Sequence, residues 1–265
     1  GVGWAGLGCT LLRRTYATAE EGEGKAVTEA ATEKKARKAK KAKPRVPRQS
    51  CGIDEAGRGA LIGPLVIGSV VLTKAAAKEL EAAGVKDSKK LTARRREELY
   101  AAIKEKATHA ETLHIAAHDI DARRESGENL NQIELLAMFQ LVFRVASKVE
   151  PLHELILDSV EANATRWSAP FRTLFRPTKV TAENGADNRY IACGAASILA
   201  KVERDRAMAE LSEQLQVPLG SGYPSDPSVK RHIDDLLQAY DGNLKSLPPY
   251  IRHTWKMKQL RAYVS

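Results

Sequence analysis

Two adjacent carboxylates follow a short strand-like segment, Cys51–Ile53. They open the run Asp54-Glu55-Ala56-Gly57-Arg58-Gly59, and an apolar stretch, 61–72, comes after it. Mg²⁺ takes hard oxygen ligands, often one or two carboxylates plus substrate phosphate, and glycine lets a backbone approach a ligand closely. The run therefore fits metal-dependent chemistry on a phosphodiester. An Asp-Glu turn with a tight Gly-Arg-Gly bend is the alternative interpretation.

Strand geometry restricts how these acids and later ones meet. Neighbouring strand residues point to opposite faces, so Asp54 and Glu55 are expected to need a bend at Gly57 to serve one site. Asp158 follows three apolar residues, where a charge is costly unless a metal, a hydrogen bond or solvent compensates it. Asp187 precedes a predicted helix, where the commonest role of aspartate is an N-cap.

Further motifs follow in a fixed order along the chain. They are Asp87-Ser88-Lys89-Lys90-Leu91, Leu157-Asp158-Ser159, Gly185-Ala186-Asp187-Asn188, the run 195–202 and Ser221-Gly222-Tyr223-Pro224. Together with the run that starts at Asp54, this ordered set resembles the ribonuclease HII family, the type 2 ribonucleases H, from about Cys51 to Trp255. One departure is Gly194, where many relatives have serine. The resemblance implies an α/β fold, a ribonuclease H-like mixed β-sheet flanked by helices, with a small helical C-terminal part.

The resemblance also implies a role for each motif residue. The family's catalytic carboxylates match four acids of this chain: Asp54, Glu55, Asp158 and Asp187. In the family these carboxylates hold two divalent ions, Mg²⁺ or Mn²⁺. A loop whose backbone touches the ribonucleotide's 2′-hydroxyl matches Gly57, Arg58 and Gly59. The tyrosine that packs on the sugar where DNA resumes matches Tyr223, with a turn aromatic as the alternative. Phosphate contacts match Lys89, Lys90, Ser197 and Lys201, although Lys201 also fits a solvated helix face.

The activity implied by this resemblance is that of an endoribonuclease. It cleaves RNA in RNA/DNA hybrids and on the 5′ side of ribonucleotides in duplex DNA, leaving 3′-hydroxyl and 5′-phosphate ends, as in DNA replication and repair. RNA is distinguished by its 2′-hydroxyl, which both donates and accepts hydrogen bonds. We expect a monomeric catalytic unit. The contrasting hypothesis is a structural or assembly component of an organellar ribonucleoprotein such as the mitochondrial ribosome, against which four costly acids argue.

The elements that position these residues alternate between strand and helix. Apolar and β-branched runs predict strands at 65–72, 113–117 and 152–160, and helical periodicity predicts helices at 92–106, 130–149 and 189–215. The second helix is expected to have one broad apolar side: Leu130, Ile133, Leu136, Ala137 and Phe143. Such alternation predicts a sheet whose ligands collect at strand ends. Asp205, in the last helix, is assigned to a structural ion pair.

Composition limits the classes of protein. A hydrophobic content of 43% in 265 residues supports one domain over 51–265. No apolar run reaches the roughly 18 residues that a membrane span needs, so we expect no membrane partner. Cys9, Cys51 and Cys193 lack metal-ligand spacing, which predicts a reducing compartment and no disulfide framework.

The positive charge is concentrated before residue 51. Residues 1–50 hold 12 Lys/Arg and 5 Glu, a net +7 of the chain's +9. Residues 1–18 carry Arg13 and Arg14 but no acid, which predicts a transit peptide and a mitochondrial location, with a chloroplast address or a random basic start as alternatives. Residues 19–50 predict a basic flexible arm that binds nucleic-acid backbone by counterion release. Nuclear targeting and a solvated tail stay open for the same run.

Overall fold

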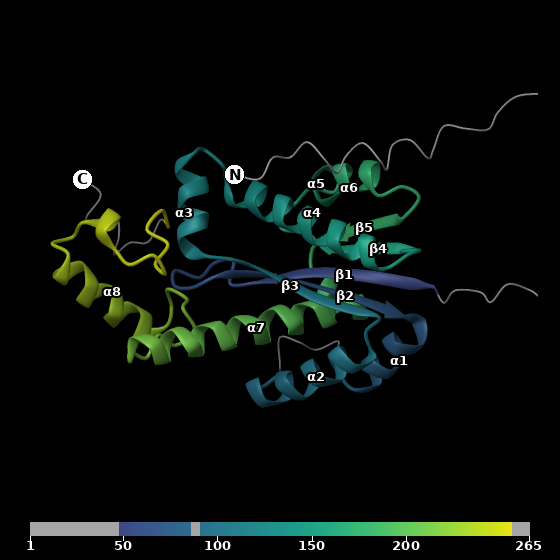
Figure 1. Ribbon diagram of the computed structural model, residues 1–265, viewed down its shortest axis with the longest axis horizontal. Coiled ribbons are helices and arrows are strands. Elements are labelled where there is room, and N and C mark those ends of the chain that lie inside the picture. Colours follow the sequence, from purple (N-terminus) through teal and green to yellow (C-terminus); the bar gives the residue numbers. More distant parts are fainter. Residues whose placement is uncertain (1–47, 86–90, 256–265) are drawn as a thin grey trace, which may run out of the picture. The chain divides into compact units, whose positions relative to one another are not determined.

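The computed structural model describes residues 48–85 and 91–255, which fall within one compact unit, 45–265. A five-stranded sheet in the order β3-β2-β1-β4-β5 forms its centre (Figure 1). β1 is antiparallel to β2 and parallel to β4, and β4 is parallel to β5. The strands are β1 (Gln49–Ala56), β2 (Leu65–Thr73), β3 (His109–Ile115), β4 (Glu154–Asp158) and β5 (Lys179–Glu183). The expected mixed α/β sheet is therefore confirmed.

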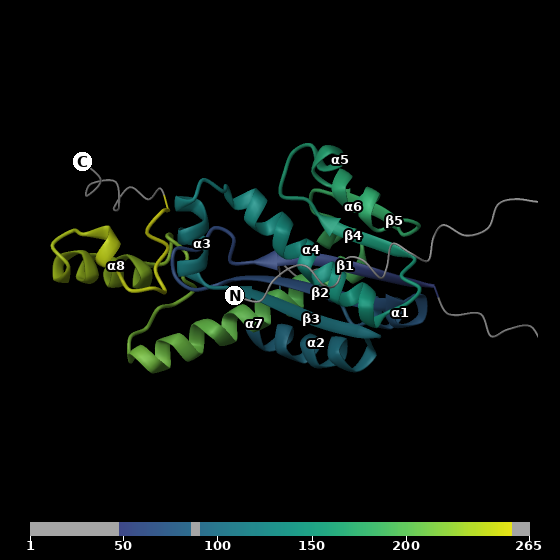
Figure 2. The same cartoon turned by 45° about the horizontal axis from the view of Figure 1, so that its top comes forward.

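Helices cover both faces of this sheet (Figures 1 and 2). One face carries α4 (Leu130–Lys148), α5 (Ala164–Trp167) and α6 (Ala169–Leu174), and the other carries α1 (Lys74–Ala82), α2 (Ala93–Lys106) and α7 (Ile191–Leu215). β2 is apolar without alternation because it is covered on both sides. Ile67 and Val71 pack in the cluster that includes α4, whereas Val70 and Leu72 pack in the cluster that includes α7.

Close approach of α7 to the sheet depends on a glycine. A Cβ on Gly52 of β1 would lie 2.1 Å from the backbone carbon of Ala192 in α7. Only glycine leaves room for this contact, and it lets α7 run along β1 so that its side chains reach the strand's C-terminal end.

A small helical part follows α7, as expected. α8 (Pro227–Ala239) begins with Asp226 as N-cap and a proline at its first position, a combination favoured at helix starts. Its buried residues Val229 and Ile233 pack with Leu61, Ile62 and Met208 in a third apolar cluster. The loop before β2 is thereby joined to the C-terminal part.

Several predicted boundaries agree with the structure. Thr92 is the N-cap of α2, and Asn129 with Gln132 forms a capping box at the start of α4. α7 begins at Ile191, two residues later than expected. The predicted strand 152–160 is wrong by two residues at each end, because β4 spans only Glu154–Asp158.

Other expectations are wrong. β3 spans His109–Ile115 rather than 113–117, because this edge strand carries half-buried polar side chains that interrupt the apolar pattern, and Ala117 already begins α3 (Ala117–Glu125). On α4, Leu136 and Phe143 are 52% and 53% exposed instead of facing the core. β1 begins at Gln49, so the last two residues of the predicted arm, 19–50, belong to the sheet.

Among the described residues no helix is long and apolar enough to span a membrane.

Candidate active site

Three acids converge at the C-terminal ends of the central parallel strands. Asp54 lies near the end of β1, Asp158 ends β4, and Asp187 lies in the short 3-10 helix η2 (Ala186–Asn188). Each offers a carboxylate oxygen that lies within 4.8 Å of those of the other two. Asp54 and Asp187 are 5% and 2% exposed. We call these three residues the carboxylate cluster.

Backbone amides hold the cluster's geometry. The N–H groups of Gly185 and Ala186 donate to Oδ1 of Asp158 over 2.7 and 3.1 Å, which fixes the turn that carries Asp187 against β4. The N–H of Glu55 donates to Oδ1 of Asp54 over 2.8 Å. Asp187 is not the N-cap of α7, because that position is Tyr190 and has no side-chain capping bond. The N-cap interpretation of Asp187 is therefore wrong.

Gly194 packs directly beneath this turn. A Cβ at Gly194 would lie 2.9 Å from the backbone oxygen of Asp187. A serine there would require the turn to shift, so the close contact between α7 and η2 depends on glycine at this position.

Burial and like charge destabilise the ionised form of the cluster in the absence of a cation. Burial, and then the neighbouring Asp158, raise the pKa of Asp54 to about 7, whereas Lys201 and Ser197 act to lower it. Glu55 has its pKa raised well above the usual range, first by burial and then by Asp54, Glu134 and Asp158. Such carboxylates are stable as anions only where positive charge or hydrogen bonds compensate them.

Glu55 differs from the other three predicted acids. β1 stays regular through Ala56, and the bend follows at Gly57. Strand alternation therefore holds, and Glu55 is outside the group whose oxygens lie within 4.8 Å of one another. Its Oε2 atom is nevertheless buried without a hydrogen-bond partner in the structure. Its role as a fourth ligand stays a prediction.

Ser197 and Lys201, one turn apart on α7, lie under Asp54. Lys201 Nζ donates to Oγ of Ser197, and both side chains favour the ionised form of Asp54. Ser197 is fully buried and Lys201 is half-buried. The structure thus brings both beside a carboxylate; whether they also contact phosphate stays a prediction.

The loop Gly57–Gly59 is joined to Tyr223. The N–H of Gly57 donates to the Tyr223 hydroxyl over 3.2 Å, and the guanidinium of Arg204 lies 5.1 Å from the centre of the tyrosine ring. Gly57 has φ of +85° and is buried, whereas Gly59 is exposed. Tyr223 is therefore part of the loop's support and not an isolated turn aromatic.

Two buried arginines that the sequence reasoning missed hold this region. Arg204 of α7 donates to the backbone oxygens of Ser221 and Ile62 over 2.9 and 3.1 Å. Arg252, fully buried, donates to the oxygens of Gly63 and Arg58. Burial lowers the pKa of Arg252 to about 10. The local sequence marks neither position as buried, because Arg204 stands between Glu203 and Asp205 in α7 and Arg252 lies outside the helices. It also does not identify the carbonyl partners.

The remaining predicted residues divide into two groups. Lys89 and Lys90 lie outside the described residues. Asp205 forms the expected surface ion pair, with Oδ2 2.7 Å from Nη2 of Arg96.

The carboxylate cluster meets the requirements of a divalent-metal site. Its ligands are hard oxygens, two of the three side chains are almost fully buried, and the neighbouring Glu55 has an unpaired buried oxygen. Mg²⁺ and Mn²⁺ favour carboxylate oxygens. We conclude that these residues fit a metal centre.

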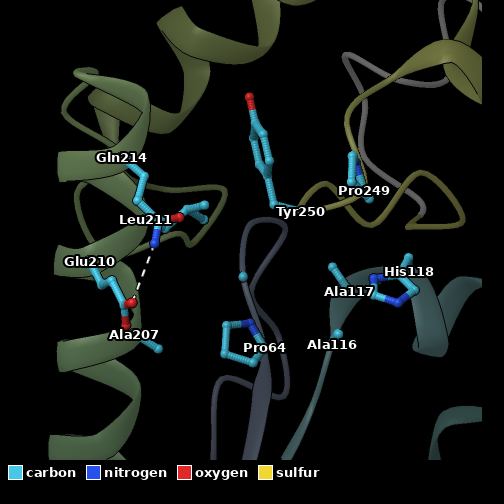
Figure 3. A pocket seen from close by; sticks show the side chains of 11 residues that line it. Pro64, Ala116, Ala117, His118, Ala207, Glu210, Leu211, Gln214, Pro249 and Tyr250 are labelled. Carbon is cyan, nitrogen blue, oxygen red and sulfur yellow. Dashed lines mark hydrogen bonds between the residues drawn. The ribbon is translucent and has the colours of Figure 1, made fainter.

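A separate pocket of about 430 Å³ lies away from these acids. In Figure 3, Tyr250 and Pro249 lie across the hollow from Leu211 and Gln214 of α7, with Pro64 between them. Its lining includes none of the predicted site residues. The chemistry therefore belongs to the strand-end cluster and not to this hollow.

Comparisons with known proteins agree on one protein family. The family model for ribonuclease HII matches residues 51–258. A ribonuclease HII of Methanothermobacter thermautotrophicus is 41% identical over 210 residues, which cover 78% of this chain and 96% of that one. The fold and site define a ribonuclease H-like nuclease, and the chain belongs to the ribonuclease HII family.

Solved structures support the same assignment. The ribonuclease HII in a complex with PCNA from Archaeoglobus fulgidus gives a TM-score of 0.70 at 33% identity, over 80% of this chain and 96% of that one. The ribonuclease H2 from Pyrococcus horikoshii gives 0.67 at 31% identity, over 81% and 96%. The protein is thus a type 2 ribonuclease H, a hydrolase and endoribonuclease of RNA/DNA hybrids.

Proposed function

We propose that this ribonuclease HII removes RNA from RNA/DNA hybrids and also cuts on the 5′ side of single ribonucleotides embedded in duplex DNA, leaving 3′-hydroxyl and 5′-phosphate ends. The observation that carries the proposal is the convergence of Asp54, Asp158 and Asp187 within 4.8 Å beside the Gly57–Gly59 loop. Mg²⁺ or Mn²⁺ is the proposed metal, because the ligand atoms are carboxylate oxygens.

The chain's own residues have distinct parts in this reaction. Asp54, Asp158 and Asp187 would hold the metal, with Glu55 as the proposed fourth acid. Divalent ions bound there supply Lewis-acid activation of water and stabilisation of the leaving 3′-oxygen. Lys201 and Ser197 act to lower the pKa of Asp54, against the larger effect of burial, and so favour the ionised form that binds a metal.

Selectivity for a ribonucleotide is assigned to the loop. Gly59 is exposed and has no side chain, so a sugar can approach the backbone closely. Tyr223 is fixed next to it through the Gly57 N–H. These groups provide a surface that can form hydrogen bonds with the 2′-hydroxyl, the group by which proteins distinguish RNA from DNA.

The test is incubation of the purified full chain with a duplex that contains one ribonucleotide. Parallel reactions contain Mg²⁺, Mn²⁺ or a chelator, and a matched all-DNA duplex serves as control. We expect one cut 5′ of the ribonucleotide, with either ion and not with chelator. Cutting of the hybrid but not of the single ribonucleotide would contradict the finer substrate assignment.

For the N-terminal residues we propose a mitochondrial address at 1–18 and a nucleic-acid-binding arm after it, with a chloroplast or nuclear location as the alternatives. The support is the sequence alone: Arg13 and Arg14 without an acid, then a Lys-rich run. Residues 1–50 fused to a fluorescent reporter should locate to mitochondria. A nuclear or diffuse signal would contradict this.

We also propose that the catalytic unit acts as a monomer. An organellar ribonucleoprotein stays a possible partner only by virtue of the basic arm. Sedimentation of the tagged protein separates the two: at moderate ionic strength it should sediment as a monomer, free of ribosomal particles. Co-sedimentation that persists in salt that breaks charge contacts would favour the ribonucleoprotein.

A further inference from the structure

The side chain of Arg58 is held by two residues of α4. Its Nε donates to Oε2 of Glu134 over 3.0 Å, and its Nη2 donates to Oδ1 of Asn131. The Arg58 side chain is 32% exposed, whereas that of Glu134 is fully buried. Arg252 donates to the backbone oxygen of Arg58 over 3.1 Å. Both the side chain and the main chain of Arg58 are therefore fixed.

A glutamate at position 134 is unfavourable for stability. It lies among buried apolar residues of α4, next to Ile133 and near Met138. Its Oε1 atom is buried and has no hydrogen-bond partner in the structure. A buried charge that is only partly paired costs more than an apolar residue of similar size. Stability alone thus gives no reason for a glutamate there, and departures from local rules concentrate at functional sites.

The same contacts link the two loops that flank the site. Asn131 Nδ2 donates to Oε1 of Glu161 over 3.1 Å. The hydroxyl of Ser159, the residue after Asp158, donates to the backbone oxygen of Glu161 over 2.9 Å. The loop after β1 and the loop after β4 therefore share one support on α4.

We propose that Glu134 is a positioning residue for substrate recognition. By holding the guanidinium of Arg58, it keeps the Gly57–Gly59 loop in the one conformation that receives the ribonucleotide. It acts through Arg58 and does not contact the metal. The inference rests on the proposed function of the loop and adds a residue to it. Substrate binding should depend on this contact, whereas the chemical step should not.

The experiment is a double-mutant cycle between Glu134 and Arg58 in the full chain. Glu134→Ala and Arg58→Ala should each raise KM for the single-ribonucleotide duplex by about tenfold, the value of a charged hydrogen bond. Because Glu134 raises the pKa of Glu55 and Arg58 lowers it, kcat is compared in the double variant, where the two effects oppose each other, and should stay within about twofold of wild type. The double variant should be no worse than either single variant, because residues in one chain of contacts are not additive. Glu134→Gln, which still accepts a hydrogen bond, should recover part of the loss.

Controls separate positioning from general damage. Glu128→Gln removes a carboxylate that pairs with Arg123 at the surface, so KM and kcat should be unchanged. Asn131→Ala loosens the same guanidinium and should raise KM even if Glu134→Ala fails to fold. Additive losses, or a fall in melting temperature with KM unchanged, would overturn the proposal.

Binding without cutting makes the test independent of the proposed activity. In chelator, the affinity of wild type for the ribonucleotide duplex over the all-DNA duplex is compared with that of Glu134→Ala. We expect the preference to shrink. An unchanged preference would reject the positioning role, whereas a wild type that binds selectively but does not cut would reject the proposed function alone.

Discussion

The carboxylate cluster and the Gly57–Gly59 loop are neighbours in space, but they are positioned by different means. Asp54 and Asp158 are placed by hydrogen-bonded strands, and Asp187 by a turn whose amides bond Asp158. The loop is supported by side chains from three distant segments. Glu134 of α4 and Arg252 near the C-terminus bond Arg58, and Arg204 of α7 packs against Gly57 while it donates to Ile62. A strand-end site depends on backbone topology, whereas the loop depends on individual long-range contacts.

This difference predicts different failures. A substitution at Asp54 or Asp187 should remove chemistry and leave the fold intact, because the strands do not need these carboxylates; Asp158 differs, since it also fixes the turn at Gly185 and Ala186. A substitution in the loop's supports should change stability, substrate binding or both, since the same atoms fix the loop and hold the sheet to the C-terminal part.

The largest expected effect is at the cluster. Asp54→Asn or Asp187→Asn should lower kcat by at least about a thousandfold, because the metal's several kcal/mol of transition-state stabilisation are lost. In chelator, the melting temperature of Asp54→Asn should equal or exceed that of wild type, since a buried charge beside Asp158 is removed. Asp205→Asn, at the surface pair with Arg96, is the control and should keep wild-type activity.

Metal binding sharpens the same comparison. Mg²⁺ should raise the melting temperature of wild type, because a ligand that binds only the folded state stabilises it. Asp187→Asn should lose most of this increase. A full metal-dependent shift in that variant would show that Asp187 is not a ligand.

Two glycines of the loop should behave differently. At Gly57 an added Cβ would lie 2.1 Å from Nε of Arg204, and φ is +85°. Gly57→Ala should therefore destabilise by roughly 1–3 kcal/mol or more from the backbone alone. At Gly59 the nearest atom is Cε1 of Tyr223 at 3.7 Å, so Gly59→Ala should melt as wild type does while substrate binding weakens. Chemical denaturation and KM for each variant measure the two effects, and equal stability losses would contradict the distinction.

The strand-end acids could be predicted from the sequence because the signal is local. An apolar strand that ends in an isolated acid, as at Asp158, already predicts the position of the side chain relative to the sheet. The alternation of Asp54 and Glu55 along β1 was predictable in the same way, but the expected effect of the bend at Gly57 was not: β1 stays regular through Ala56 and Glu55 lies outside the cluster.

The loop's supports could not be predicted in this way. Arg252 and Gly63 are separated by 189 residues, and Glu134 and Arg58 by 76. The periodicity of α4 describes Glu134 only as a charge among apolar residues. The bounds of the edge strand β3 were predicted wrongly for a related reason. Its half-buried polar side chains weaken the apolar pattern on which the prediction of a strand depends.

Tyr223 allows a finer test of recognition. Tyr223→Ala should reduce cutting at a lone ribonucleotide more than within a long RNA strand, because only the former has deoxyribose on the side where DNA resumes. Tyr223→Phe keeps the ring and loses the acceptor for the Gly57 N–H, so it separates stacking from loop support. The measurement is the ratio of variant to wild-type rates on the two substrates at fixed salt. Equal losses on both would assign Tyr223 to the fold alone.

The smallest expected effect concerns the basic arm, which lies outside the described residues. Deleting 19–44 leaves the unit 45–265 whole. The deletion should weaken binding to every duplex and reduce the slope of log affinity against log salt by about 0.9 for each phosphate that the arm had neutralised. A variant in which the Lys and Arg of 25–43 are replaced by Gln keeps the length and should show the same change. Because charge alone reads phosphates on any sequence, the preference for a ribonucleotide should survive in both variants; its disappearance would show that recognition is not confined to the loop and Tyr223.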